Sequence, residues 1–259
     1  MLMIDKLCYS SGLRYVNATL KFLFAMTTLC LCIISRSIMI AGITLGATGI
    51  LTVLYGKIPL KAYLKLMRGP AVFLFLSTIA IIFSYERYPL SFAAIPMGKK
   101  YITIDPQSFS FAFQLVITAF ASVSCLFFLS LSTPITDILN VLKKFRCPKL
   151  MIELMLLIYR FIFILLEMAD TLSKSSQSRL GNVNFKTACR SMGTLLSALL
   201  VRAFKCSNQL FDAMESKCYD GDILVLEEHY PVLSGQIISF LLFEAVLLMI
   251  FIYQSISFF

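Results

Sequence analysis

The chain has 259 residues, of which 59% are hydrophobic and only 14% are charged, and its formal net charge is +9. A water-soluble domain is about 45 to 50% apolar, so this composition excludes an ordinary soluble protein and predicts that much of the surface faces lipid. The basic excess indicates loops beside membrane spans and contact with membrane lipid, and no nucleic-acid partner is predicted.

Five apolar stretches predict membrane-spanning helices, and four of them are close to or longer than the ~20 residues that a span needs. They are residues 22–35, 38–55, 69–85, 106–136 and 230–259. The first is short, and Lys21 and Arg36 at its ends are expected to extend to the lipid headgroups. Glu244 alone interrupts the last stretch. The fold class predicted is therefore an all-α polytopic membrane protein with about five transmembrane helices.

Basic residues indicate the orientation of these spans, because cytoplasmic loops are enriched in Lys and Arg. They gather before the first span, between the second and third, and after the fourth. The N-terminus is therefore predicted in the cytoplasm and the C-terminus outside. The stretch between spans three and four is predicted to be an external loop, with a hairpin near residues 101–104.

The sequence changes character between Pro134 and Pro231, where charges break every apolar stretch. Three domains follow: residues 1–133 with four spans, residues 134–229 as a cytoplasmic helical region, and residues 230–259 as the final span. Pro148 starts one long helix, Asn184 caps a second, and Asp220 with the following glycine stops it. One short helix and two long helices are thus expected in this region.

Both long helices carry an apolar stripe at helical spacing, which indicates that they pack on each other or on the membrane surface. The first stripe comprises Leu154, Phe161, Leu165, Met168 and Leu172, and the second comprises Met192, Leu195, Leu196, Leu199, Ala203, Leu210 and Met214. Arg179 continues the first stripe and Lys217 ends the second helix. Such a terminal cation can reach a groove of another protein or the lipid headgroups, and spacing alone does not distinguish the two.

The residues at these helix ends resemble a known family, the transmembrane T component of energy-coupling factor (ECF) transporters, and within it the cobalt-transport permeases (CbiQ). Family members carry two short motifs, usually Ala-Arg-Gly or a variant, at the ends of two long cytoplasmic helices. Ser178-Arg179-Leu180 and Ser216-Lys217-Cys218 occupy these places here. Residues 4–6, 159–161 and 213–221 are also similar to the cobalt branch, so the resemblance covers essentially the whole chain.

The resemblance implies a coupling subunit in the bacterial inner (cell) membrane. Each motif would seat in one ABC-type ATPase subunit (CbiO-like), and residues 134–229 would be a coupling region that transmits ATP-driven closure. The partners implied are a metal-binding membrane subunit (CbiM-like) and a small accessory membrane subunit (CbiN-like). Lys217 departs from the family's arginine, because lysine keeps the charge but lacks the planar five-donor fork. At the second motif we therefore expect either weaker coupling to the ATPase or an ATPase groove adapted to lysine.

The chain itself is not predicted to be an enzyme. It contains no phosphate-binding G-x-x-x-x-G-K-[ST] loop, so ATP hydrolysis is assigned to a partner. The sole histidine, His229, lies beside Glu227 and Glu228, and we interpret the three as a solvated charge cluster, with no metal site and no cofactor. Other hypotheses are the same role for nickel or a vitamin, a self-sufficient permease, and a membrane-embedded enzyme that uses Glu244.

Overall fold

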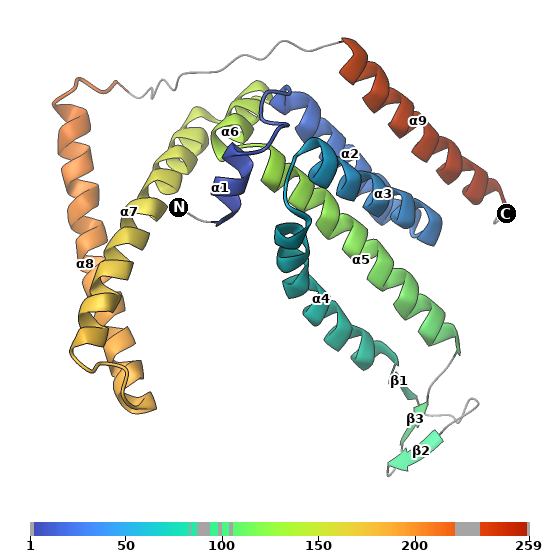
Figure 1. Ribbon diagram of the computed structural model, residues 1–259, viewed down its shortest axis with the longest axis horizontal. Coiled ribbons are helices and arrows are strands. Elements are labelled where there is room, and N and C mark those ends of the chain that lie inside the picture. Colours follow the sequence, from blue (N-terminus) through green and yellow to red (C-terminus); the bar gives the residue numbers. More distant parts are fainter. Residues whose placement is uncertain are drawn as a thin grey trace. The chain divides into compact units, whose positions relative to one another are not determined.

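The computed structural model describes residues 3–82, 84–86, 94–97, 100–103, 106–220 and 234–257 (Figure 1). Its contacts divide the chain into two compact units. One comprises Leu2–Ile138 and Glu228–Phe259, and the other comprises Leu139–Glu227. The first unit contains the apolar helices, and the second contains two long amphipathic helices.

Within the described residues, five helices of the first unit are long and apolar enough to cross a membrane. They are α2 (Ala18–Ser35), α3 (Ile38–Ile50) with its π-helical continuation η1 (Leu51–Tyr55), α4 (Leu60–Ile82), α5 (Pro106–Ser132) and α9 (Ser234–Ser257), and a short helix α1 (Met3–Tyr9) precedes them. The predicted all-α polytopic fold is thereby confirmed. The 27 residues of α5 extend about 40 Å, enough to cross a hydrocarbon core of ~30 Å.

Helix α5 is central to this unit, because α2, α3 and α4 all pack against it. Phe24 of α2 meets Phe128 of α5 edge to face, with 5.5 Å between the ring centroids. The buried Ser124 hydroxyl of α5 is hydrogen-bonded to the Thr48 hydroxyl of α3 (2.6 Å) and to the Tyr63 hydroxyl of α4 (2.8 Å). These bonds satisfy polar groups that have no water to meet inside a membrane, and they join three helices.

The predicted position of Lys21 at the lipid surface is wrong. Its side chain is only 4% exposed. The ammonium donates to the Leu13 carbonyl (3.0 Å) and to the Ser132 carbonyl (2.8 Å). Because α2 begins at Ala18, Lys21 lies inside its first turns, next to the end of α5. Arg36, at the other end of α2, is exposed as expected.

The third span begins earlier than the sequence predicts, because α4 starts at Leu60 rather than near Gly69. Three cations that were assigned to the preceding loop belong to this helix: Lys61, Lys65 and Arg68. They are exposed, whereas Tyr63 and Met67 are buried. One face of these helical turns is charged and the other is buried. Because the charged face stays out of the hydrocarbon, the three cations do not interrupt the helix.

Between α4 and α5 the chain forms a small antiparallel sheet. It consists of β1 (Ser84–Glu86), β2 (Ala94–Met97) and β3 (Lys100–Thr103), in the order β1-β3-β2. Strand β3 is central, and Ile102 pairs with both Tyr85 and Ile95. The sheet coincides with the segment in which the sequence predicts a hairpin, although the predicted last residue, Ile104, lies outside the described residues.

The second unit is built mainly from α7 (Lys149–Ser178) and α8 (Phe185–Glu215), which α6 (Ile135–Lys144) precedes. The expected one short helix and two long helices are therefore present. Asn184 caps α8 as predicted, in a capping box with Thr187, whose hydroxyl accepts the Asn184 N–H at 3.0 Å. The predicted stop at Asp220-Gly221 extends into residues that the structure does not describe.

Helices α7 and α8 pack against each other, as their apolar stripes predict. The stripe residues Phe161 and Leu165 of α7 and Leu195 and Leu210 of α8 are half-buried. Three predicted members lie outside this contact, because Leu154 is 47% exposed and Met192 and Leu196 are each 59% exposed. A single partner helix covers a narrower sector than the predicted stripe, so the margins of the stripe stay uncovered.

Candidate functional site

The first predicted motif, Ser178-Arg179-Leu180, lies at the C-terminal end of α7. Arg179 caps the helix, and Leu180 follows with a left-handed backbone at φ 59°. The Leu180 N–H donates to the Gln177 carbonyl (3.1 Å), and the Gly181 N–H donates to the Ser176 carbonyl (2.9 Å). These two bonds form a Schellman motif, which satisfies carbonyls at the C-terminus of a helix.

The end of α8 repeats this geometry. Lys217 takes the place of the arginine, and Cys218, at φ 55°, takes the place of the leucine. The Cys218 N–H donates to the Glu215 carbonyl (3.0 Å), and the Tyr219 N–H donates to the Met214 carbonyl (3.0 Å). The sequences Ser-Arg-Leu and Ser-Lys-Cys therefore share a backbone conformation as well as a residue pattern.

The third residue of each motif is strained. A left-handed backbone costs a non-glycine residue roughly 1–2 kcal/mol, and glycine is the usual residue there. Leu180 is 74% exposed, so packing of its side chain within this chain does little to offset the strain. Strained residues of this kind are concentrated at functional sites.

Replacing Leu180 by glycine tests this strain. Leu180→Gly is expected to raise the free energy of unfolding by about 1 kcal/mol, because glycine adopts the left-handed backbone without steric cost. The matched control is Leu200→Gly in the interior of α8, where the leucine is 60% exposed. There glycine is expected to destabilise the chain by about 1 kcal/mol. Thermal unfolding in detergent measures both, and equal destabilisation by the two variants contradicts the strain.

The two motifs lie at opposite ends of α8. The 31 residues of this helix extend about 46 Å at ~1.5 Å per residue. Arg179 and Lys217 are exposed, and among the described residues neither side chain makes a hydrogen bond or an ion pair. Each cation is therefore available to acceptors on another molecule.

A cleft of about 310 Å³ lies beside Arg179, where α7 turns into α8. Hydroxyl groups contribute to its lining, and they belong to Ser175, Ser176, Ser191 and Thr194. The Ser176 and Ser191 hydroxyls are hydrogen-bonded to each other between the two helices. Gly181 makes the turn tight, because a Cβ there would lie 2.8 Å from the Ser176 carbonyl oxygen. The first cation thus lies next to a cleft whose lining includes four hydroxyl groups.

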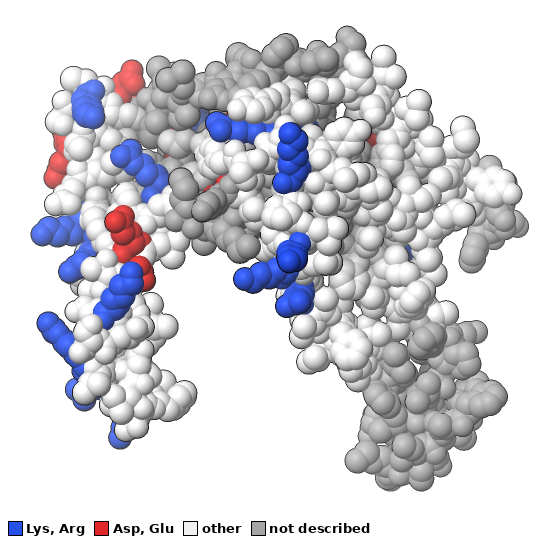
Figure 2. Space-filling view, viewed as in Figure 1, with Lys and Arg blue, Asp and Glu red and all other residues white. Residues whose placement is uncertain are grey.

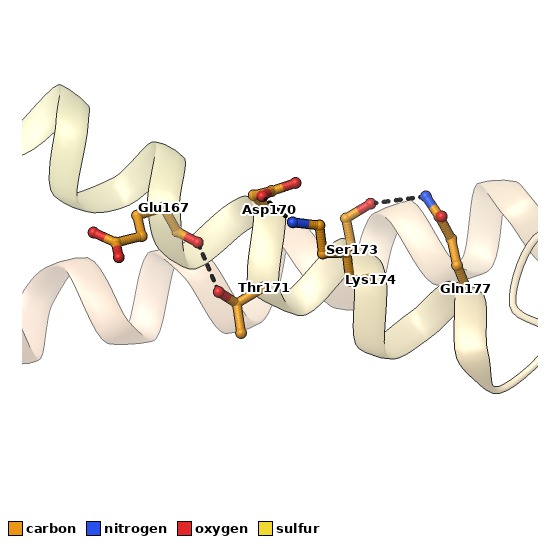
Figure 3. Close-up of polar contacts among 6 residues, drawn as sticks. All are labelled: Glu167, Asp170, Thr171, Ser173, Lys174 and Gln177. Carbon is orange, nitrogen blue, oxygen red and sulfur yellow. Dashed lines mark hydrogen bonds and ion pairs between the residues drawn. The ribbon is translucent and has the colours of Figure 1, made fainter. Parts of the chain in front are cut away.

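Polar pairs four residues apart lie along α7 as it approaches Arg179. Figure 3 shows three of them: the Thr171 hydroxyl with the Glu167 carbonyl (2.9 Å), Lys174 Nζ with Asp170 Oδ2 (2.7 Å), and Gln177 Nε2 with the Ser173 hydroxyl (3.3 Å). The two side-chain pairs, Lys174 with Asp170 and Gln177 with Ser173, support a helix modestly, and less so when they are exposed to solvent. They favour a continuous α7 up to the motif.

One contact that the sequence does not indicate holds the second motif. The Tyr219 hydroxyl donates to Glu153 Oε2 at 2.8 Å, so the residue directly after Cys218 is bonded to the start of α7. The other carboxylate oxygen, Oε1, is buried and has no hydrogen-bond partner among the residues that the structure describes. Because 66 residues separate the pair, no local pattern reveals it.

Glu244, the acidic residue of the last span, forms an interhelix contact. It is 8% exposed, and its Oε1 accepts a hydrogen bond from the Thr27 hydroxyl at 2.8 Å, which links α9 to α2. In the part of the chain that the structure describes, no group of three His, Cys, Asp or Glu side chains is placed to hold a metal ion. The predicted charge cluster at Glu227, Glu228 and His229 lies outside that part.

The fold and these helix ends define a class: a multi-pass membrane protein with a pair of long amphipathic helices. The model of the family described as "CbiQ: Cobalt transport protein" matches residues 10–230. The chain therefore belongs to the CbiQ family of cobalt transport proteins, which is a family of transport permeases and not of enzymes.

Three relatives agree with this assignment. The chain is 28% identical to the cobalt transport protein CbiQ of Salmonella typhimurium over 220 residues, which are 85% of this chain and 97% of that protein. It is 29% identical over 248 residues to a putative fused cobalt transport protein CbiMQ of Methanocorpusculum labreanum, covering 94% of this chain and 41% of that protein. It is 28% identical over 177 residues to the energy-coupling factor transporter transmembrane protein EcfT of Ruminiclostridium cellulolyticum, covering 66% of each.

Proposed function

We propose that this protein is the transmembrane coupling subunit of an ECF-type ABC transporter for cobalt uptake in the cell membrane. It transmits ATP hydrolysis by two partner ATPases to a metal-binding membrane subunit. The observation that carries the proposal is the repeated geometry of Arg179 and Lys217, which are two exposed cations at the C-terminal ends of α7 and α8, where the backbone has the same conformation. Each cation binds an acidic or carbonyl-lined groove of one ATPase.

The partners follow from the same proposal. CbiO-like ATPases bind the two motifs, and a CbiM-like subunit, with a small CbiN-like accessory subunit, captures the metal. A relative whose name joins CbiM and CbiQ in one chain supports the CbiM-like partner. Residues 134–229 form the coupling region, and the basic loops favour a cytoplasmic location for it.

The site geometry favours this role over the membrane-embedded enzyme. Glu244 is the acidic residue of a span, and its contact with Thr27 makes it a link between α9 and α2. A hydrolytic site needs a second acid, a histidine or a metal close to such a carboxylate. A coupling subunit needs no such group, because its chemistry takes place in the partners.

Reconstitution tests the proposal. Proteoliposomes that hold this chain, the two ATPases and the metal-binding subunit are expected to accumulate labelled cobalt when ATP is supplied. Cobalt uptake is expected to be lost when any one of these components is omitted. Labelled nickel in parallel vesicles identifies the cargo. Uptake by this chain alone, or unchanged uptake without it, contradicts the proposal.

A further inference from the structure

Helix α4 changes character at Gly69. Before that residue its exposed side chains include Lys61, Lys65 and Arg68, and after it the exposed side chains are large and apolar. The apolar group consists of Val72 (63% exposed), Phe73 (73%), Phe75 (68%), Leu76 (65%) and Ile79 (41%). Figure 2 shows Lys and Arg side chains gathered over the region where α4 begins.

The three cations share one face of the helix, because they are spaced i, i+4 and i+7. The opposite face is packed against the rest of the unit, since Ala62 and Tyr63 are 8% and 9% exposed. Tyr63 is also hydrogen-bonded to Ser124 of α5. This packing fixes the direction in which the charged face points.

Nothing in the helix compensates these charges. Helix α4 contains no acidic residue in its first turn or beyond, and like charges at this spacing repel each other. Lys61 also lies in the first turn, where the helix dipole disfavours a cation. Among the described residues none of the three makes an ion pair. The three exposed charges are therefore able to attract an anion from outside the chain.

The position of the cations along the helix identifies that anion. Lys61 and Arg68 are seven residues apart, which is about 10 Å along the axis. The polar layer of a bilayer is about 5 to 8 Å thick on each side of the hydrocarbon, and flexible cationic side chains can extend along it. The exposed aromatic and aliphatic side chains that follow Pro70 face lipid tails. We propose that this cationic face, Lys61, Lys65 and Arg68, binds the headgroups of anionic phospholipids.

The test uses the full chain in lipid nanodiscs of phosphatidylcholine with one third phosphatidylglycerol, and native mass spectrometry counts the lipids that stay bound. Wild type is expected to retain phosphatidylglycerol in preference to phosphatidylcholine. Each basic residue strengthens such attraction about fivefold, so the triple variant K61Q/K65Q/R68Q is expected to lose on the order of a hundredfold of this preference. Inorganic phosphate added to phosphatidylcholine nanodiscs is not expected to bind in its place.

The matched control is R190Q/R202Q/K205Q, which removes the same charge from the exposed face of α8. It is expected to keep the preference. Equal loss in both variants, or no loss in the first, overturns the proposal, as does tight binding of free phosphate. If the first variant does not fold, wild type in about 1 M salt, where the Debye length is ~3 Å, is still expected to lose the preference. The proposal is independent of the cargo and of the ATPases.

Discussion

Reversing the charge of both motif cations, Arg179→Glu together with Lys217→Glu, is expected to abolish binding of the ATPases and cobalt uptake. Each glutamate places an anion where the proposed partner groove offers carboxylates or carbonyls, and truncating or reversing a hydrogen-bonded charge at an interface costs about 2–5 kcal/mol. Two such losses together weaken the complex by roughly a thousandfold or more. Co-purification with tagged ATPases and uptake of labelled cobalt measure the result.

The control is Arg190→Glu together with Lys205→Glu, which changes the same total charge on the exposed face of α8. It is expected to leave assembly and uptake close to wild type. Normal assembly of the motif variant contradicts the role of the motifs.

The single variants distinguish the contributions of the two motifs. Arg179→Glu is expected to weaken assembly more than Lys217→Glu, because arginine binds a planar acceptor with two parallel hydrogen bonds and lysine does not. Lys217→Arg is expected to strengthen it.

Replacing Lys21 by methionine is expected to lower the free energy of unfolding by about 2 kcal/mol, because two backbone carbonyls lose their donor. One of them belongs to Ser132, the last residue of α5, whose carbonyl has no partner within the helix. Methionine has a similar volume, so the lost hydrogen bonds dominate over any cavity. The thermal unfolding midpoint in detergent measures the effect.

The environment of Lys21 sharpens this expectation. Burial raises the pKa of the neighbouring Cys8 thiol to about 11, although Lys21 itself lowers it. Cys8 therefore stays uncharged at neutral pH and does not form a thiolate partner for the ammonium, which leaves the carbonyls as its hydrogen-bond acceptors. Lys144→Met, at an exposed position of α6, is the control and is expected to leave the midpoint unchanged. An unchanged midpoint for Lys21→Met contradicts the structural role.

Local patterns in the sequence were sufficient for the features that depend on local chemistry. Span length and hydropathy located the apolar helices, and Asn184 marked the start of α8 because an N-cap acts on the next turn alone. The same patterns did not predict contacts between residues that are far apart in the sequence, because tertiary packing determines these contacts. Lys21 resembled a lysine that extends to lipid, and its acceptor at Ser132 lies 111 residues away. The Tyr219–Glu153 bond was missed for the same reason.

The motif residues were located by spacing and resemblance, but their backbone was not predicted. Glycine is the residue favoured in the left-handed position after a helix, and Gly181 directly follows the first motif. The structure puts Leu180 in that position and uses Gly181 for a close approach to Ser176. The sequence cannot reveal that Leu180 adopts the strained left-handed backbone, because glycine is the residue usually found in that conformation.

The placement of the two motifs before and after α8 has a mechanical consequence. In a continuous α-helix the distance between two points and the angle between them are tied together, at about 1.5 Å and about 100° per residue. Arg179 lies just before the turn that leads into α8, and Lys217 lies just after the end of α8. Their spacing therefore cannot drift by single insertions or deletions within α8, because each would also turn one cation away from its partner. Only changes near a whole number of turns preserve the phase, so α8 acts as a ruler that sets where two separate proteins can be held.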